Sequence, residues 1–180
     1  IVLVASRLTK EKNVNMAIKA MSEVIKKFPR PLLLIVGEGP EKKKLQAAGC
    51  RLQTNVIFEP WTNDIISYYR TADVFVLTSN YEGGARSPAE AAASGLPVVM
   101  TDVPPARETI IDGENGFVVP VNNHRRLAVK LIELISDESK RMMFKEQSLA
   151  TAVGFITKEV YLRLYYQALV GALSRNKKYE

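Results

Sequence analysis

The feature that most constrains the fold is a regular alternation of short apolar segments with stretches of helical character. The apolar segments recur at residues 1–5, 32–36, 55–59, 74–78, 97–101 and 116–120. The first of them, Ile-Val-Leu-Val-Ala, contains no polar residue, which is typical of a strand that is buried on both faces. The alternation therefore predicts six strands, each followed by a helix.

The stretches between these segments have helical periodicity. From Val14 to Phe28 the apolar residues share one face, and Lys19 and Glu23 lie largely opposite. The other predicted helices cover residues 40–48, 64–70, 88–93, 106–111, 125–135, 138–153 and 158–173. Strands that alternate with helices pair in parallel, and their helices cover both faces of the sheet. We predict one α/β domain over residues 1–180: a doubly wound, Rossmann-like sheet of six parallel strands with a C-terminal helical extension.

The composition excludes several classes of site. Cys50 is the only cysteine and His124 the only histidine, which excludes a disulfide framework and leaves little room for a zinc site or a Ser-His-Asp triad. No apolar run approaches the roughly 18 residues that span a bilayer, and no secretory signal is visible. The chain begins at Ile1, inside a strand pattern, so we expect it to be part of a longer protein whose localisation signals could lie elsewhere.

The net charge of +6 suits an anionic ligand or an anionic membrane face. The basic residues are scattered, and the run Lys42-Lys43-Lys44 fits the solvated face of a helix. Aromatic and basic residues do not interleave as they do in proteins that bind single strands, so no nucleic-acid partner is expected.

Ligands of such sheets bind at the carboxyl ends of the strands. Five loops follow those ends and would line one crevice: residues 6–12, 37–40, 59–62, 79–87 and 102–107. The loop after the fourth strand carries two carboxylates, Glu82 and Glu90, and leads into a helix whose N-terminal N–H groups can face an anion. Both carboxylates also have a structural interpretation. Ser87-Pro-Ala-Glu90 has the pattern of a capping box with Pro88 at the first helical position, and Glu82 could be an ordinary loop residue.

Arg7 and Lys12, in the first of these loops, are candidate phosphate ligands. The known phosphate-binding patterns fit poorly: the chain has no P-loop motif, and after Gly37-Glu-Gly39 the third glycine of the dinucleotide fingerprint is replaced by Lys42. No Asp-x-Asp pair is present to hold a divalent cation. A bound diphosphate would therefore be neutralised by Arg7, Lys12 and backbone N–H groups, without metal.

A carboxylate pair and five flanking motifs, in this order and spacing, carry a family resemblance. Glu82 and Glu90 form a Glu-x7-Glu pair. The flanking motifs are Ser6-Arg-Leu-Thr-Lys-Glu-Lys12, Ile35-Val-Gly-Glu-Gly-Pro40, Ala72-Asp-Val-Phe-Val-Leu-Thr-Ser79, Glu90-Ala-Ala-Ala-Ser-Gly-Leu-Pro-Val-Val99 and Ile111-Asp-Gly-Glu-Asn-Gly-Phe117. Together they resemble the C-terminal, donor-binding domain of the family-four (group 1) retaining glycosyltransferases, whose two Rossmann-like domains form the GT-B fold. The resemblance is strong over residues 1–135 and loose beyond.

The resemblance implies a role for each matching position. The catalytic set would be Glu82 at the donor sugar, with Arg7 and Lys12 at the departing diphosphate. Glu90 would accept hydrogen bonds from the ribose hydroxyls. The remaining donor-binding residues would be Gly37 and Gly39, where the backbone approaches the nucleotide, Pro60, Trp61 and Thr62 around the base, and Gly83, Gly84, Ala85 and Arg86 at the sugar and phosphate.

The resemblance also implies substrates and partners. The substrate would be a nucleoside-diphosphate sugar of the UDP or GDP type, with no cofactor and no metal. A missing N-terminal domain would bind the acceptor, the helix within residues 154–180 would pack back on that domain, and the chain would be inactive alone. The parent enzyme would work on the cytoplasmic side, with a peripheral membrane contact permitted by the positive charge.

The chain departs from the family in the loop Glu82-Gly-Gly-Ala-Arg86, where the family often has Glu-Gly-Phe-Gly-Leu. Arg86 could contact phosphate or pair with an acidic substrate. Two other functions remain open: one half of a nucleotide-sugar epimerase, and a non-catalytic module that senses nucleotide sugar or acts as a scaffold. Retention of Arg7, Lys12, Glu82 and Glu90 favours the enzyme.

Overall fold

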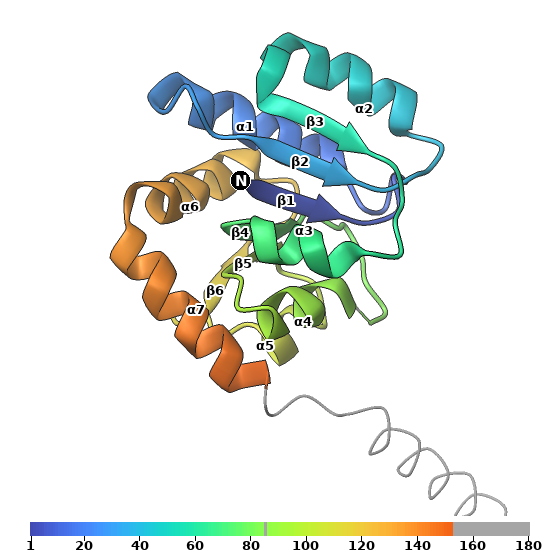
Figure 1. Cartoon of the computed structure of the whole chain (residues 1–180). Helices are drawn as coiled ribbons and strands as arrows, with labels where there is room; N and C mark the ends of the chain where they lie inside the picture. The colour runs from blue at the N-terminus through green and yellow to red at the C-terminus, as the bar shows by residue number, and fades with distance from the viewer. Residues whose placement is uncertain (85, 153–180) are drawn as a thin grey trace, which may run out of the picture.

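The computed structural model describes residues 1–84 and 86–152, with only the backbone of residues 53 and 54, and its centre is a parallel six-stranded sheet (Figure 1). The strands are β1 (Val2–Ala5), β2 (Leu33–Val36), β3 (Val56–Glu59), β4 (Val74–Leu77), β5 (Val98–Thr101) and β6 (Gly116–Val119). Their order is β3-β2-β1-β4-β5-β6, and every neighbouring pair is parallel. The order reverses direction between β1 and β4, so the predicted doubly wound sheet is confirmed.

Helices cover both faces of the sheet. They are α1 (Val14–Lys27), α2 (Lys42–Gly49), α3 (Ile65–Thr71), α4 (Arg86–Ala93), α5 (Ala106–Thr109), α6 (His124–Ser136) and α7 (Glu138–Ala152), with a 3₁₀ segment at Cys50–Asn55. In β1, Val2 and Val4 pack in the core under α1, α2 and α6, whereas Leu3 and Ala5 pack in the core under α3, α4 and α5. This alternation explains why the strands are apolar at almost every position.

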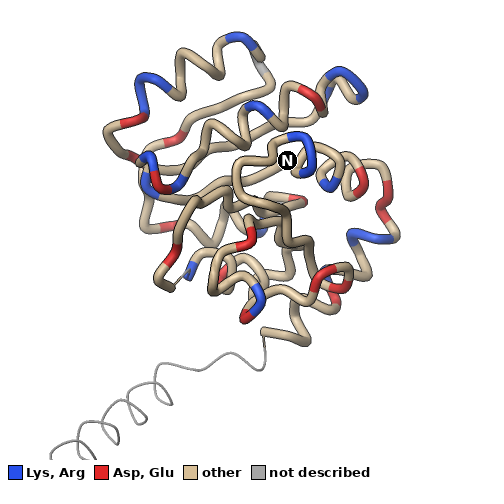
Figure 2. The backbone as a smooth tube through the Cα atoms, turned by 180° about the vertical axis from the view of Figure 1, so that it is seen from behind, with Lys and Arg blue, Asp and Glu red and all other residues tan. Residues whose placement is uncertain are grey.

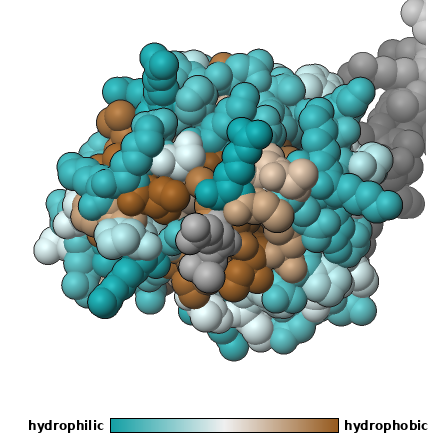
Figure 3. Space-filling view, turned by 90° about the horizontal axis from the view of Figure 1, so that it is seen from above, coloured by the Kyte–Doolittle hydropathy of each residue, from teal (hydrophilic) through white to brown (hydrophobic). Residues whose placement is uncertain are grey.

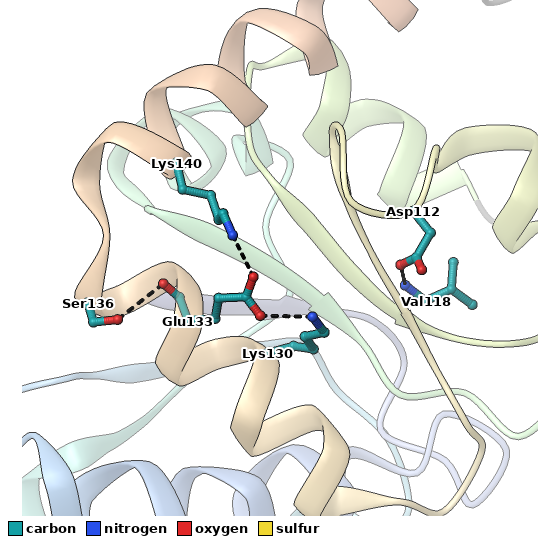
Figure 4. Close-up of polar contacts among 6 residues, drawn as sticks. All are labelled: Asp112, Val118, Lys130, Glu133, Ser136 and Lys140. Atoms are coloured by element: carbon teal, nitrogen blue, oxygen red, sulfur yellow. Dashed lines mark hydrogen bonds and ion pairs between the residues drawn. The ribbon is translucent and has the colours of Figure 1, made fainter.

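The last described helix, α7, is anchored to the sheet and to α6. Ser148 is buried and donates to the carbonyl oxygens of Leu96 (3.0 Å) and Asn115 (3.2 Å). Glu133 of α6 accepts hydrogen bonds from Lys130 (2.8 Å) and from Lys140 of α7 (2.6 Å) (Figure 4). These contacts fix the angle between the two consecutive helices.

The short strand β6 is held at its start by a side chain. Asp112 accepts a hydrogen bond of 2.9 Å from the backbone N–H of Val118 (Figure 4). Phe117 of this strand packs against Phe144 of α7, with ring centroids 5.2 Å apart, and the ammonium of Lys130 lies 3.9 Å from the Phe117 ring centroid. The edge strand is therefore covered from the α6–α7 side.

The predicted elements match the structure within about two residues at most ends. Two differences matter. The helix expected to begin at Pro88 begins at Arg86, and the helix expected to end at Ile111 ends at Thr109. The predicted helix at 158–173 lies outside the described residues. None of the described helices is long and apolar enough to cross a membrane.

Basic and acidic residues are interspersed along the described backbone (Figure 2). Seen from above, the face over α1 and α2 shows apolar side chains in its middle and hydrophilic ones around them (Figure 3). A groove of about 450 Å³ lies between these two helices, lined by Ile18, Lys19, Ala48, Arg51 and Leu52 among others.

Candidate functional site

A pocket of about 350 Å³ lies at the carboxyl ends of the strands, as the topology predicts. It is lined by residues from four separate segments: Ala5, Ser6 and Arg7; Val36; Trp61, Thr62, Asn63, Ile65 and Tyr69; and Ser87 and Glu90. Four of the predicted site residues, Arg7, Trp61, Thr62 and Glu90, thus share one hollow. A second pocket, of about 460 Å³, lies at the opposite edge around Phe28, Pro31 and Ile135 and contains none of the predicted site residues.

Lys12 and Glu82, 70 residues apart in the chain, do not line this pocket but form an ion pair between the loops that follow β1 and β4. The Nζ of Lys12 lies 2.5 Å from Oε1 of Glu82, and the exposed fractions of the two side chains are 20% and 6%. The buried Ser79 donates a second hydrogen bond of 2.5 Å to the same oxygen. Glu82 is therefore a partly desolvated carboxylate held by a cation and a hydroxyl, unlike an exposed loop carboxylate.

The loops that carry this ion pair are hydrogen-bonded to each other. Thr78 at the end of β4 donates to the carbonyl oxygens of Lys12 (3.1 Å) and Asn13 (3.0 Å). The backbone N–H of Asn80 donates to the carbonyl of Glu11 at 2.7 Å, and the Asn13 side chain donates to Asn80 Oδ1 at 3.0 Å. Asn13 itself has φ 44°, a left-handed conformation that asparagine tolerates better than most residues. Lys12 thus reaches Glu82 from a braced backbone.

Glu90 does not act as the capping residue that its sequence pattern suggested. Since α4 begins at Arg86, Ser87 lies inside the helix, and the carboxylate of Glu90 accepts a hydrogen bond of 3.0 Å from the hydroxyl of Tyr69 in α3. Burial, together with the negative charge of Glu90, raises the pKa of Tyr69 well above its ordinary value. Sequence reasoning missed both Tyr69 and Ser79; a serine three residues before Glu82 was a visible signal, but nothing pointed to Tyr69.

The glycines of the two predicted loops have different surroundings. A Cβ at Gly37 would lie 2.0 Å from the carbonyl oxygen of Ser6, and one at Gly39 would lie 2.4 Å from that of Leu8. These glycines are needed for two loops to pack together, whatever else they contact. A Cβ at Gly84 would meet nothing within 4 Å, and one at Gly83 would meet only the Tyr81 hydroxyl at 3.8 Å. The described residues thus leave open space at Gly84.

The remaining predicted residues lie at the rim. Trp61 is 66% exposed, and Pro60, Arg7 and Arg86 are also exposed. Arg7 makes no ion pair within the described part of the chain, so its guanidinium is available to a ligand. Ala85 lies outside the described residues. Within residues 1–84 and 86–152 no group of three or more His, Cys, Asp or Glu side chains is arranged to hold a metal.

Comparison with known proteins agrees with the fold. The poly(glycerol-phosphate) alpha-glucosyltransferase of Bacillus subtilis (strain 168) is 37% identical over 153 residues, which cover 83% of this chain and 23% of that protein. The pneumococcal O-GlcNAc transferase GtfA, solved in complex with UDP and GlcNAc, matches with a TM-score of 0.85 at 28% identity, over 96% of this chain and 35% of that chain. The C-terminal domain of the glycosyl transferase group 1 family protein LpcC from Francisella tularensis matches with a TM-score of 0.75 at 28% identity, over 84% of each chain.

The chain spans less than half the length of the Bacillus subtilis glucosyltransferase and of other curated relatives that it matches. The family described as "Glycosyl transferases group 1" matches residues 1–150. This match covers all six strands and the loops that follow them, and the chain therefore belongs to the group 1 glycosyl transferases.

Proposed function

We propose that this chain is the donor-binding domain of a retaining, metal-independent glycosyltransferase, which moves a sugar from a nucleoside-diphosphate sugar to an acceptor hydroxyl. The observation that carries the proposal is the convergence of Arg7, Lys12, Glu82 and Glu90 at one edge of the sheet. The UDP complex of GtfA supports a nucleoside diphosphate as the ligand. The match to a domain solved by itself supports the assignment to the C-terminal half of a GT-B enzyme.

The geometry suits the departure of a diphosphate. When the bond between sugar and phosphate breaks, negative charge develops on the leaving phosphate, and cations that are already in place stabilise it. Arg7 offers a planar fork at the pocket, and Lys12 offers a point charge from a braced loop. Two such cations support neutralisation without a metal ion.

In this proposal Glu82 orients the sugar. Its Oε1 accepts from both Lys12 and Ser79, which leaves Oε2 without a partner among the described residues and open to a sugar hydroxyl. Holding the sugar beside the cations lowers the barrier by orientation. The open space at Gly84 supports close approach of the donor to this loop.

The acceptor is expected to bind to a further domain of the parent protein. We therefore propose that this chain alone binds nucleotide and does not transfer sugar. The net charge of +6 supports a peripheral contact of the parent enzyme with an anionic, cytoplasmic membrane face, which co-sedimentation with anionic vesicles would test.

Calorimetric titration with UDP, GDP, ADP and CMP, without metal, tests the donor site. We expect saturable binding of one diphosphate, weakened by roughly tenfold or more in both Arg7→Ala and Glu90→Ala, since each removes a charged partner of the ligand. Arg51→Ala, on the far side of α1, is the matched control and should bind normally. Absence of binding to all four nucleotides would refute the donor site, and sugar transfer by this chain alone would refute the need for a second domain.

A further inference from the structure

We propose that Tyr69 is a positioning residue for nucleotide binding: its hydroxyl holds the carboxylate of Glu90 in the orientation that receives the ribose of a nucleoside diphosphate. This inference rests on the proposed function. The Tyr69 hydroxyl lies 3.0 Å from Oε2 of Glu90, and both residues line the pocket.

Tyr69 is rigid enough for this role. Its side chain is 1% exposed, and its ring packs edge-on against Phe75 of β4, with centroids 5.8 Å apart. The helix that carries it is capped by Asp64, which accepts from the backbone N–H of Ser67 (3.3 Å) and from its hydroxyl (2.7 Å). The phenol therefore projects into the pocket from a fixed point.

Glu90 needs such a restraint. It is an exposed side chain with three rotatable bonds in the middle of the eight-residue helix α4, and it belongs to no ion pair among the described residues. A carboxylate has about four acceptor sites, of which the Tyr69 hydroxyl occupies one, so acceptor sites remain for the two ribose hydroxyls. The raised pKa of Tyr69 keeps the phenol protonated, so that it remains a donor.

Helix α3, which carries Tyr69, links the predicted ribose contact to the predicted border of the base. Thr62 lines the pocket and accepts a hydrogen bond of 3.0 Å from the backbone N–H of Asp64, the residue that caps α3. The segment from Thr62 to Tyr69 thus runs from the predicted border of the base to the carboxylate at the predicted ribose. A fixed spacing between these two points favours a nucleoside over a free sugar phosphate.

The rival explanation is that Glu90 only accepts the hydrogen bond of the buried Tyr69 hydroxyl, because a buried tyrosine hydroxyl usually has a hydrogen-bond partner. The two explanations differ in what happens to a ligand without ribose hydroxyls. If Tyr69 acts through Glu90, its hydroxyl matters only for ligands that bind Glu90. If the contact is merely structural, removing the hydroxyl changes the binding of all ligands equally or of none.

The test is titration of wild type, Tyr69→Phe and Tyr68→Phe with UDP and with 2′,3′-dideoxy-UDP. We expect Tyr69→Phe to weaken UDP binding about tenfold, since its bond is made to a charged group, and to leave dideoxy-UDP binding within about twofold of wild type. Tyr68→Phe, the matched control, should change neither. Thermal unfolding of each variant confirms that the fold is kept.

Several outcomes would overturn the inference. Equal weakening of both ligands by Tyr69→Phe, or no weakening of UDP, refutes the positioning role. A wild type that binds both ligands equally well refutes the ribose contact while the donor site stands. A wild type that binds no nucleoside diphosphate at all refutes the proposed function together with the inference.

Discussion

The packing of Gly37 allows a test of which glycines are needed for stability of the fold and which are needed for ligand binding. In Gly37→Ala the new methyl group would lie 2.0 Å from the carbonyl oxygen of Ser6, where real Cβ atoms stay beyond 3.0 Å, and φ at this position is +148°. A shift of about 1 Å would be needed in a backbone that is tied on both sides, because the N–H of Ser6 bonds to Val36 (3.2 Å) and that of Gly37 to Glu59 (3.1 Å).

The expected cost of Gly37→Ala is about 3 kcal/mol, the sum of about 1–2 kcal/mol for the backbone conformation and about 1–3 kcal/mol for the overpacked contact. For a domain of this size, this corresponds to a fall of about 6–12 °C in the midpoint of thermal unfolding. The matched control is Gly84→Ala, which meets nothing within 4 Å and should change stability by less than about 1 kcal/mol.

Circular dichroism during heating and urea titration would measure both variants, and calorimetry with UDP would measure ligand binding. We expect Gly84→Ala to weaken binding of the ligand without a loss of stability, since a methyl group there meets no described atom but would occupy space that we propose for the donor. A loss below about 1 kcal/mol in Gly37→Ala would refute the steric reasoning. So would equal losses of stability in the two variants.

Two further predictions concern hydrogen bonds away from the pocket's lining. Ser79→Ala removes a 2.5 Å hydrogen bond to Glu82 and should lower the free energy of unfolding by about 1.5 kcal/mol in urea titration. The control Ser94→Ala loses only a hydrogen bond to its own helix, and its free energy of unfolding should be within about 0.5 kcal/mol of wild type. Equal effects of the two variants would contradict the role of Ser79. Hydrogen bonds from Lys130 and then Lys140 hold the pKa of Glu133 below its usual value, so the carboxylate stabilises the fold above the unfolded-state pKa, and the stabilisation is lost as pH falls through the folded-state pKa. Glu133→Gln should therefore lower the free energy of unfolding by about 0.5 kcal/mol at neutral pH and leave it unchanged at about pH 2–3. The control Glu146→Gln, at an exposed position, should leave it unchanged at both pH values. An effect of Glu133→Gln that does not depend on pH would count against the ion pairs.

Much of the fold follows from local sequence because both faces of the sheet are covered. Strands such as Val74–Leu77 must then be apolar at successive positions, and runs of this kind are easy to recognise. The topology in turn places the loops after the strands at one edge, which is why the sequence predicts that Arg7 and the loop bracketed by Glu82 and Glu90 face one crevice.

The pairing of side chains could not be predicted in the same way. Lys12 and Glu82 were both candidates, but their ion pair depends on how two loops dock. The capping-box pattern at Ser87 was misleading because Arg86 and Ser87 take helical conformations and Glu90 finds a tertiary partner instead. The contact between Tyr69 and Glu90 could not be predicted from the sequence because it depends on the packing of α3 beside α4. The glycines at 37 and 39 were recognised, but their steric reason lies in a loop about 30 residues earlier.

The bonds between residues 10–13 and 78–82 also bear on motion. Thr78, Asn80 and the Lys12–Glu82 pair connect the two loops at several points along their length. Moving one loop away from the other would break all of these bonds at once, so we expect the two loops to fluctuate as a single unit. The backbone N–H of Asn80, which donates to the carbonyl oxygen of Glu11, should then exchange slowly with solvent. Entry and exit of a ligand would then occur without separation of these loops, past the exposed indole of Trp61 that lines the pocket.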